Sequence, residues 1–81
     1  MSTEDAHVDQ ELDLRGEVCP YTFVKSKLAI EPLESGHVLR VLFDHRPAVA
    51  NVSGSMENEG HAVLEKGEVS PGLWEVVVRK A

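Results

Sequence analysis

The sequence predicts an α/β fold, a two-layer sandwich of element order β-α-β-α-β-β in which two helices cover one face of a mixed four-stranded sheet. Three observations lead to this prediction. Residues 11–15 alternate apolar and charged residues, which is the period of a half-buried strand, and three further stretches, residues 37–43, 61–65 and 73–80, are predicted as strands. Two intervening segments begin at Pro20 and Pro47 and carry apolar residues at helical spacing. Right-handed crossovers between the strands then place both helices on the same side of the sheet.

The composition is that of one small domain with room for one modest core. The chain has 81 residues, of which 42% are hydrophobic and 27% charged, the ordinary balance of a soluble globular protein. Residues 1–8 are polar and lack periodicity, so we expect a flexible leader there and a single domain over residues 9–81. No apolar run is long enough to span a membrane. A lone cysteine forms no internal disulfide, which favours a cytoplasmic location.

The chain's only cysteine follows a short predicted strand and a glycine turn. Residues 11–15 alternate apolar and charged side chains, which predicts the strand. Gly16 permits the turn, since glycine adopts positive φ without strain. Pro20 fits the first position of a helix, where its missing N–H costs no hydrogen bond. Cys19 is therefore expected to be the N-cap of that helix.

At a helix start, Cys19 is expected to be a reactive thiolate. Its sulfur would face the free backbone amides of Tyr21 and Thr22. A helix start carries about half a positive elementary charge, which stabilises an anion over a neutral thiol. Thiolates at such positions have lowered pKa values and are nucleophilic. The alternative is that Cys19 is a small buried hydrophobic residue, the usual role of a free cysteine.

The first helix is expected over residues 20–31, because Pro32 disfavours its continuation. Two neighbouring stripes of its surface carry apolar residues. We expect Val24 and Leu28 to make the core contacts of this helix. At the margins of that contact we expect Phe23, Ile30 and Leu33.

A second strand and a second helix follow. The second helix, over residues 47–59, is weakened by Ser53-Gly54-Ser55, because a glycine in a helix costs about 1 kcal/mol relative to alanine. The sequence offers Asp44 or His45 as its cap. The strand is predicted over residues 37–43, with a core face made of Leu39, Val41 and Phe43.

The last two strands are predicted to form a hairpin. Strand three is expected from residue 61 to residue 65 or beyond. Residues 66–72 contain two glycines and a proline, which predicts a hairpin-like connection. The final strand is expected over residues 73–80, with one face made of Trp74, Val76 and Val78.

These residues resemble a known family. The run Leu12-Asp13-Leu14-Arg15-Gly16-x-x-Cys19-Pro20 is similar to the N-terminal signature of the TusA/SirA-like small sulfur carriers. The family's Cys-Pro-x-Pro motif has Thr22 here in place of its second proline. The resemblance implies the same two-layer fold. From about Asp9 it covers nearly the whole chain, through Gly36, Asp44, Pro47-Ala48 and Gly60-His61 to the terminal strand from Trp74 to Lys80.

The resemblance implies a sulfurtransferase-type carrier rather than a free-standing enzyme, with no cofactor. In this interpretation Cys19 accepts a sulfane sulfur as a persulfide and passes it along a sulfur relay. Such relays serve tRNA thiolation, molybdenum-cofactor maturation or sulfur oxidation. The donor would be a cysteine desulfurase or a rhodanese, and the acceptor a DsrE-like protein or a thiolation enzyme. Two alternatives stay open: a regulatory or protein-interaction module that docks through the sheet face carrying Val38 and Leu42, and a thiol redox switch at Cys19.

Residues near the motif suggest supporting roles. Lys27 matches a basic position that is common on the family's first helix and could receive an acidic partner segment, although a helix lysine is more often a solvated charge. Thr22 has an amide that proline lacks, so we expect Thr22→Pro to raise the pKa of Cys19. His61 is expected to make a structural hydrogen bond. Asp13 and Arg15 flank the turn and could shape access to Cys19, although a plain strand-edge ion pair is the more common role for such residues.

Charge and residue spacing argue against two other function classes. The net charge of −6 disfavours nucleic-acid binding, which needs clustered Lys and Arg. The four histidines show no metal-ligand spacing, and a single cysteine without a Cys-x-x-Cys motif argues against a structural zinc site.

Overall fold

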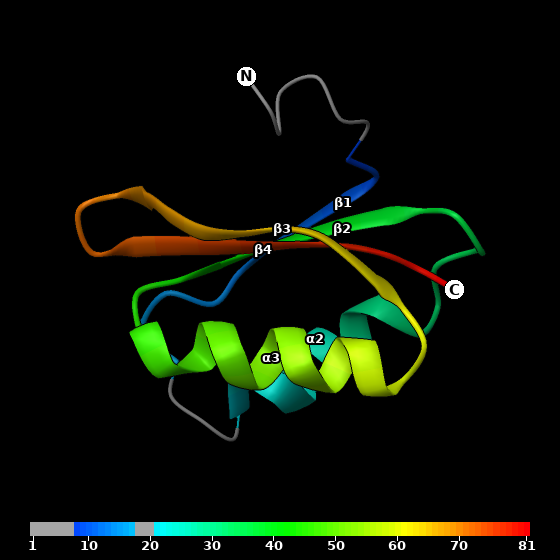
Figure 1. Ribbon diagram of the computed structural model, residues 1–81, viewed down its shortest axis with the longest axis horizontal. Coiled ribbons are helices and arrows are strands. Elements are labelled where there is room, and N and C mark those ends of the chain that lie inside the picture. The colour runs from blue at the N-terminus through cyan, green and yellow to red at the C-terminus, as the bar shows by residue number, and fades with distance from the viewer. Residues whose placement is uncertain (1–7, 18–20) are drawn as a thin grey trace.

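The computed structural model describes residues 8–17 and 21–81; residues 18–20 and residues 1–7, most of the expected leader, lie outside that description. Within the described residues, six elements follow one another along the chain (Figure 1). This order confirms the predicted β-α-β-α-β-β arrangement. The elements are β1 (Gln10–Asp13), α2 (Tyr21–Ile30), β2 (Val38–Phe43), α3 (Arg46–Asn58), β3 (Ala62–Ser70) and β4 (Leu73–Arg79).

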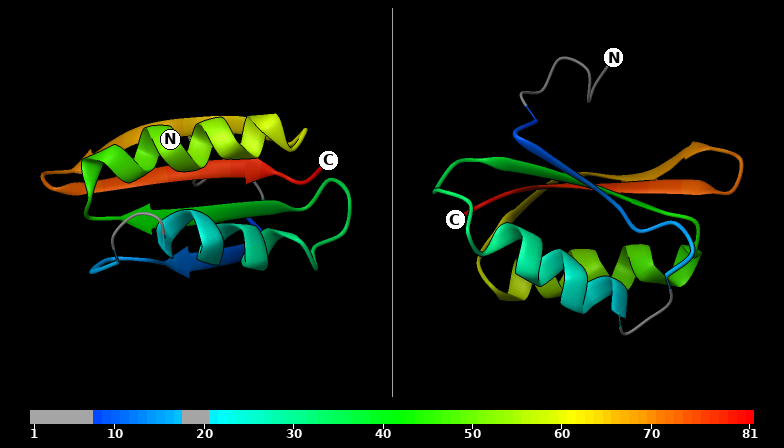
Figure 2. Two further views of the ribbon diagram at one scale, coloured as in Figure 1. Left: turned by 90° about the horizontal axis from the view of Figure 1, so that it is seen from below. Right: turned by 180° about the vertical axis from the view of Figure 1, so that it is seen from behind.

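The strands form one mixed sheet in the order β1-β2-β4-β3. β1 and β2 are parallel, whereas β4 runs antiparallel to both β2 and β3. Both helices cover the same face of this sheet (Figures 1 and 2). Seen from the helix side in Figure 2, α3 lies over β3 and β4, and α2 lies over β1 and β2. The two-layer sandwich predicted from right-handed crossovers is therefore confirmed.

The core lies between the sheet and the two helices. Leu39, Val41 and Phe43 of β2 are fully buried, which confirms the predicted core face of that strand. Val78 and Val76 of β4 lie directly opposite the first two of these residues. Burial of each such side chain contributes about 1.5–3 kcal/mol, so this layer is the main source of stability. From α3 the core receives Ala48, Val52 and Met56.

α3 is continuous over its whole length despite the glycine at its middle, so the expected weakening leaves no break. His45 is its N-cap residue and makes no side-chain capping hydrogen bond. The helix ends in a Schellman-type turn at Gly60, which has a φ of 94°. The Gly60 amide donates to the Glu57 carbonyl at 3.0 Å, and the His61 amide donates to the Met56 carbonyl at 3.0 Å.

The prediction that Val24 and Leu28 pack α2 against the core is wrong. Its buried residues are Thr22, Ser26 and Ile30, whereas Val24 and Leu28 are 45% and 62% exposed. The small hydroxyl residues can be buried because the Ser26 hydroxyl donates to the Thr22 carbonyl at 2.7 Å and so needs no water partner. Ile30, predicted at the margin, belongs to the core itself. Packed at that margin, as predicted, are Phe23 and Leu33.

The connection between the last two strands is much shorter than predicted. β3 continues to Ser70, and only Pro71 and Gly72 separate it from β4. Gly72 has a φ of 78°, which glycine adopts without strain, so two residues suffice for the turn. Two register shifts bulge this edge strand. Bulges and charged side chains keep an exposed sheet edge from pairing with another chain, which explains the polar composition that suggested a loop.

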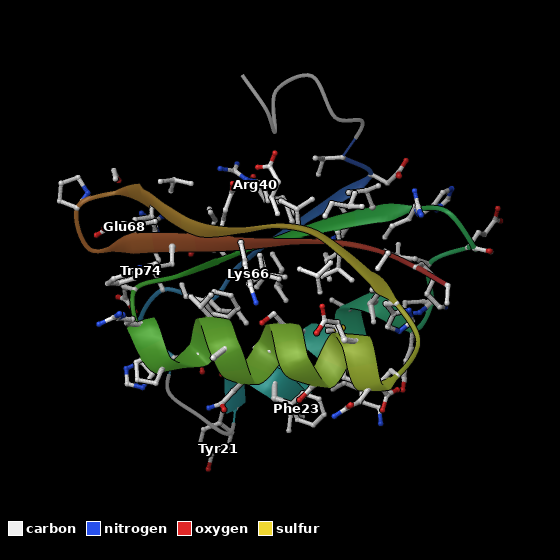
Figure 3. All side chains as sticks on the ribbon, viewed as in Figure 1. Tyr21, Phe23, Arg40, Lys66, Glu68 and Trp74 are labelled. Atoms are coloured by element: carbon white, nitrogen blue, oxygen red, sulfur yellow. The ribbon has the colours of Figure 1, made fainter. Side chains whose placement is uncertain are left out.

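The sheet face turned away from the helices carries a nearly buried carboxylate, Glu75. The Arg40 Nε lies 2.7 Å from its Oε1, and the Arg40 Nη1 lies 2.7 Å from Glu11 Oε2. The hydrogen bond to Glu75 is the largest cause that raises the pKa of Arg40 above its ordinary value. Figure 3 shows Arg40 on this side of the sheet. The face that carries Val38 and Leu42 is therefore crossed by an ion-pair network.

Candidate functional site

The predicted reactive residue lies outside the part of the chain that the structure describes. Cys19 and Pro20, predicted as the N-cap and the first helical residue, belong to residues 18–20. The described residues on either side are its neighbours in the sequence. Gly16 lies in the turn before it, and Tyr21 and Thr22 begin the described part of α2 after it.

The turn before the cysteine is held against the turn before α3. Gly16 has a φ of 91°, which confirms the predicted glycine turn. Its amide donates to both carboxylate oxygens of Asp44, at 2.9 Å to Oδ1 and 3.0 Å to Oδ2. The Glu17 amide donates to the Leu14 carbonyl at 3.0 Å, which closes the turn. Gly16, three positions before Cys19 in the sequence, is thus fixed to a residue 28 positions further along the chain.

Asp44 has a different role from the one that its position in the sequence suggests. An aspartate between a strand and a helix is a common N-cap, but here His45 occupies the N-cap position. Asp44 instead binds the Gly16 amide. Local sequence patterns do not reveal this role, because the partner lies in another turn.

The predicted ion pair between Asp13 and Arg15 is confirmed. Arg15 Nη2 lies 2.7 Å from Asp13 Oδ2, and the Arg15 amide donates to Asp13 Oδ1 at 3.0 Å. These hydrogen bonds lower the pKa of Asp13 from 3.8 to about 2, and the bond from the Arg15 side chain has the largest effect. β1 ends at Asp13 rather than at Arg15 as predicted, because the pair belongs to the turn. Both side chains are exposed, so the pair shapes the turn more than it stabilises the fold.

The two residues that follow the predicted Cys-Pro pair point in opposite directions. Thr22, at the position of the family's second proline, is fully buried, and its carbonyl accepts the Ser26 hydroxyl. Tyr21 is 59% exposed and projects away from the sheet at the foot of the molecule (Figure 3). Of these two supporting residues, Tyr21 is therefore the one on the surface, two positions after Cys19 in the sequence.

The exposed side of α2 is apolar. Tyr21, Val24 and Leu28 are spaced three and four residues apart, so they lie on one face of the helix. All three are exposed. We refer to these three side chains as the α2 outer face. Two of the three, Val24 and Leu28, are the residues that hydrophobic patterning directs toward the core, and the structure leaves both exposed to solvent.

Two lysines next to the α2 outer face are already paired. Lys25 Nζ lies 2.9 Å from Glu17 Oε2, and Lys27 Nζ lies 3.5 Å from Glu59 Oε2. The second pair joins α2 to the residue that follows α3. Lys27, predicted to support the site, therefore has an internal partner and is not an isolated charge.

The remaining described residues give little sign of metal or membrane chemistry. His61 Nδ1 accepts a hydrogen bond from the Ala81 amide at 3.0 Å, the structural role expected for it. Among the described residues, no group of three or more His, Cys, Asp or Glu side chains could hold a metal ion. Neither of the described helices has the length and apolarity that a membrane span requires.

Comparison with known proteins assigns this arrangement to a family. Residues 10–80, which include Cys19, match the family model of sulfurtransferase TusA. The chain belongs to this family. A protein of Archaeoglobus fulgidus named as a candidate sulfur carrier is 47% identical over 72 residues, which cover 89% of this chain and 82% of the relative. TsuB of Escherichia coli K12, also named as a candidate sulfur carrier, is 30% identical over 74 residues, which cover 91% of this chain and 99% of the relative.

A solved structure supports the same assignment. The crystal structure of a SirA-like protein from Desulfitobacterium hafniense matches the fold with a TM-score of 0.78 and 31% sequence identity. The match covers 86% of this chain and 95% of that one. These matches confirm the predicted resemblance to the TusA/SirA-like carriers. They also confirm the predicted two-layer fold. Membership in a family of sulfur carriers implies protein partners that donate and accept sulfur.

Proposed function

We propose that this chain carries sulfane sulfur as a persulfide on Cys19 and delivers it to a partner protein. The observation that supports the proposal most directly is the family match over residues 10–80, because this stretch contains the only cysteine of the chain. A persulfide forms on a thiol, so no other side chain in the sequence can hold the cargo. A protein that depends on one free thiol suits the reducing cytoplasm.

The proposed transfer is a thiol exchange with no net oxidation or reduction. The Cys19 thiolate attacks the terminal sulfur of a donor persulfide, R–S–SH. The donor S–S bond breaks, a new S–S bond forms to give Cys19–S–SH, and the donor leaves as the thiolate R–S⁻. The acceptor thiolate then attacks the terminal sulfur of Cys19–S–SH and releases the Cys19 thiolate. One cysteine is sufficient because each partner supplies the second thiol.

We assign the α2 outer face to contact with the donor and acceptor proteins. Tyr21 begins this face two positions after Cys19, and Val24 and Leu28 continue it along the helix. Aromatic and aliphatic side chains surrounded by charged ones are typical of a protein interface. A partner thiol must reach the persulfide itself, so its protein has to contact the carrier close to Cys19. Among the described residues, the α2 outer face is the exposed apolar surface that lies nearest to Cys19 in the sequence.

Loading with sulfur tests the proposal. The protein is incubated with a cysteine desulfurase and cysteine, or with a rhodanese and thiosulfate, and the intact chain is weighed. We expect a gain of one sulfur atom that a reducing agent removes. Cys19→Ser should show no gain. Failure of the wild-type chain to load from either donor would refute the proposal.

The same samples separate the two alternatives. Oxidation of Cys19 by peroxide in a protein that never loads sulfur would identify a redox switch. Absence of loading together with partner binding that is unchanged in Cys19→Ser would identify an interaction module. Sulfur loading that depends on Cys19 contradicts both.

Charge on the α2 outer face tests the docking assignment. Leu28→Asp should slow loading from the protein donor about tenfold, since an unpaired charge buried in an apolar contact costs more than about 1 kcal/mol. Loading from glutathione persulfide should stay unchanged, because this small donor needs no docking surface. The matched control is Leu64→Asp, which places the same charge on an exposed apolar residue of the edge strand β3. Equal slowing by both variants would refute the assignment.

A further inference from the structure

A hollow of about 300 Å³ opens where the β3–β4 hairpin faces the start of α3. Val49 and Ala50 of α3 form one wall, and Trp74 of β4 forms another. Arg46 and Lys66 line it from the helix and from β3 respectively. Figure 3 shows Lys66 extending from β3 toward α3, with Trp74 on the same side of the sheet near the hairpin. The hollow thus combines an apolar surface with two cationic side chains.

The two cations stand out because most basic side chains of the protein are already engaged. All eight Lys and Arg residues lie in the described part of the chain. Arg15, Lys25, Lys27 and Arg40 form ion pairs, and Lys80 donates to two backbone carbonyls. Among the described residues, three cationic side chains remain with neither an ion pair nor a hydrogen bond: Arg46, Lys66 and Arg79. The first two of these line the hollow.

An acidic side chain at the same hollow does not neutralise them. Glu68 also lines it, but its Oε2 accepts a hydrogen bond from the Gly72 amide at 3.1 Å. This bond holds the carboxylate on the hairpin turn. No ion pair joins Glu68 to Arg46 or Lys66 in the described structure, so both cations stay available to a ligand. In a chain of net charge −6, such a local excess of positive charge attracts anions to this hollow.

We propose that this hollow binds a small carboxylate with an aromatic or apolar body. The carboxylate would pair with Arg46 and Lys66, since guanidinium and ammonium groups are the usual partners of carboxylates. The apolar body would lie against Trp74, Val49 and Ala50, where aromatic rings gain both contact area and favourable stacking. The hollow has the volume of a small ligand site, which excludes a large cofactor.

The site is separate from the proposed sulfur chemistry. The proposed contacts use Arg46, Lys66 and Trp74, and none of the three α2 outer-face residues lines the hollow. The Cys19→Ser protein should therefore bind the carboxylate as tightly as the wild-type chain. A failure of sulfur loading would therefore count against the proposed function, and a failure of carboxylate binding would count only against this site.

Titration with phenylacetate tests the proposal, because Trp74 is the only tryptophan of the chain and gives one indole N–H signal in NMR spectra. We expect a saturable shift of this signal with a Kd of about 1 mM or below, within reach of a ligand of this size. The neutral counterpart 2-phenylethanol should bind about tenfold more weakly or not at all. Acetate, which lacks the ring, should also bind about tenfold more weakly than phenylacetate or not at all.

Single substitutions locate the binding. Arg46→Gln and Lys66→Gln should each weaken phenylacetate binding about tenfold, the effect of losing one charge-assisted hydrogen bond. Arg79→Gln removes the third unpartnered cation, which lies outside the hollow, and should leave binding unchanged. Ala50→Phe should block binding by filling the hollow without changing its charge. No saturable shift, or equal weakening in Arg79→Gln, would overturn the proposal.

Discussion

Alanine substitutions at Leu28 and Ile30 test which face of α2 packs on the sheet. The two residues are similar in size and lie in the same helix, yet Leu28 is 62% exposed and Ile30 is 1% exposed. Ile30→Ala removes buried contacts and leaves a cavity, which costs about 2–5 kcal/mol. Leu28→Ala removes mostly solvated surface, so we expect a change below about 0.5 kcal/mol.

These costs are large enough to separate by urea denaturation. A domain of 81 residues has a stability of about 4–12 kcal/mol, so Ile30→Ala removes a substantial part of it. With a slope of about 1 kcal/mol per molar urea, the unfolding midpoint should fall by about 2 M or more in Ile30→Ala and by less than about 0.5 M in Leu28→Ala. Trp74 fluorescence reports the transition.

The opposite ranking would refute this description of the helix. If Leu28→Ala lowered the midpoint as much as Ile30→Ala, Leu28 would be in the core, as hydrophobic patterning suggests. Leu28 would then be unavailable to partner proteins, and the docking assignment of the α2 outer face would fail with it.

Three further predictions concern the charges and the start of α2. Glu75→Ala should destabilise the fold by about 2 kcal/mol in urea unfolding. This is less than the cost of breaking a fully buried pair, because the Arg40 guanidinium is partly exposed and keeps Glu11 as a second partner. A loss below about 0.5 kcal/mol would contradict the buried pairing. The pKa of Asp13 is lowered to about 2, so its pair with Arg15 stabilises the protein above pH 3.8 and loses this effect as the pH falls through about 2. In an NMR titration, Arg15→Gln should raise this pKa toward 3.8, and an unchanged value would contradict the assigned cause. Thr22→Pro should raise the pKa of Cys19 in an ultraviolet titration of the thiolate, whereas an unchanged or lowered value would argue against a thiolate facing the amides of the first helical turn.

The strands could be predicted because their pattern leaves one consistent register. In β2, the alternating residues Leu39, Val41 and Phe43 are all core residues. A shift by one position would expose all three and bury Arg40, so the hydrophobic pattern determines which face is inside. The hairpin was harder to predict, because the charged residues of an edge strand resemble those of a loop.

The packing face of α2 could not be predicted from hydrophobicity. Val24 and Leu28 form a more apolar stripe than Thr22 and Ser26, and patterning selects the more apolar one. The buried stripe is tolerated because the Ser26 hydroxyl bonds within the helix. A threonine and a serine four residues apart are a signal of such a bond. A conflict between pattern and packing is itself informative, since such conflicts concentrate at functional surfaces.

The candidate site was predicted in its local parts and missed in its long-range ones. The glycine turn at Gly16 follows from the residue itself. Its hydrogen bonds to Asp44 and the pairing of Lys27 with Glu59 join residues far apart in the sequence, and no local pattern marks them. The same is true of the hollow beside Trp74, whose walls come from three different elements.

Cold cyanolysis of the sulfur-loaded, desalted protein measures the cargo on Cys19 most directly. Cyanide removes sulfane sulfur as thiocyanate and returns the free thiol. The carrier function predicts about one thiocyanate per loaded chain and none from Cys19→Ser treated in the same way. Equal yields from both proteins, or no thiocyanate from either, would contradict it.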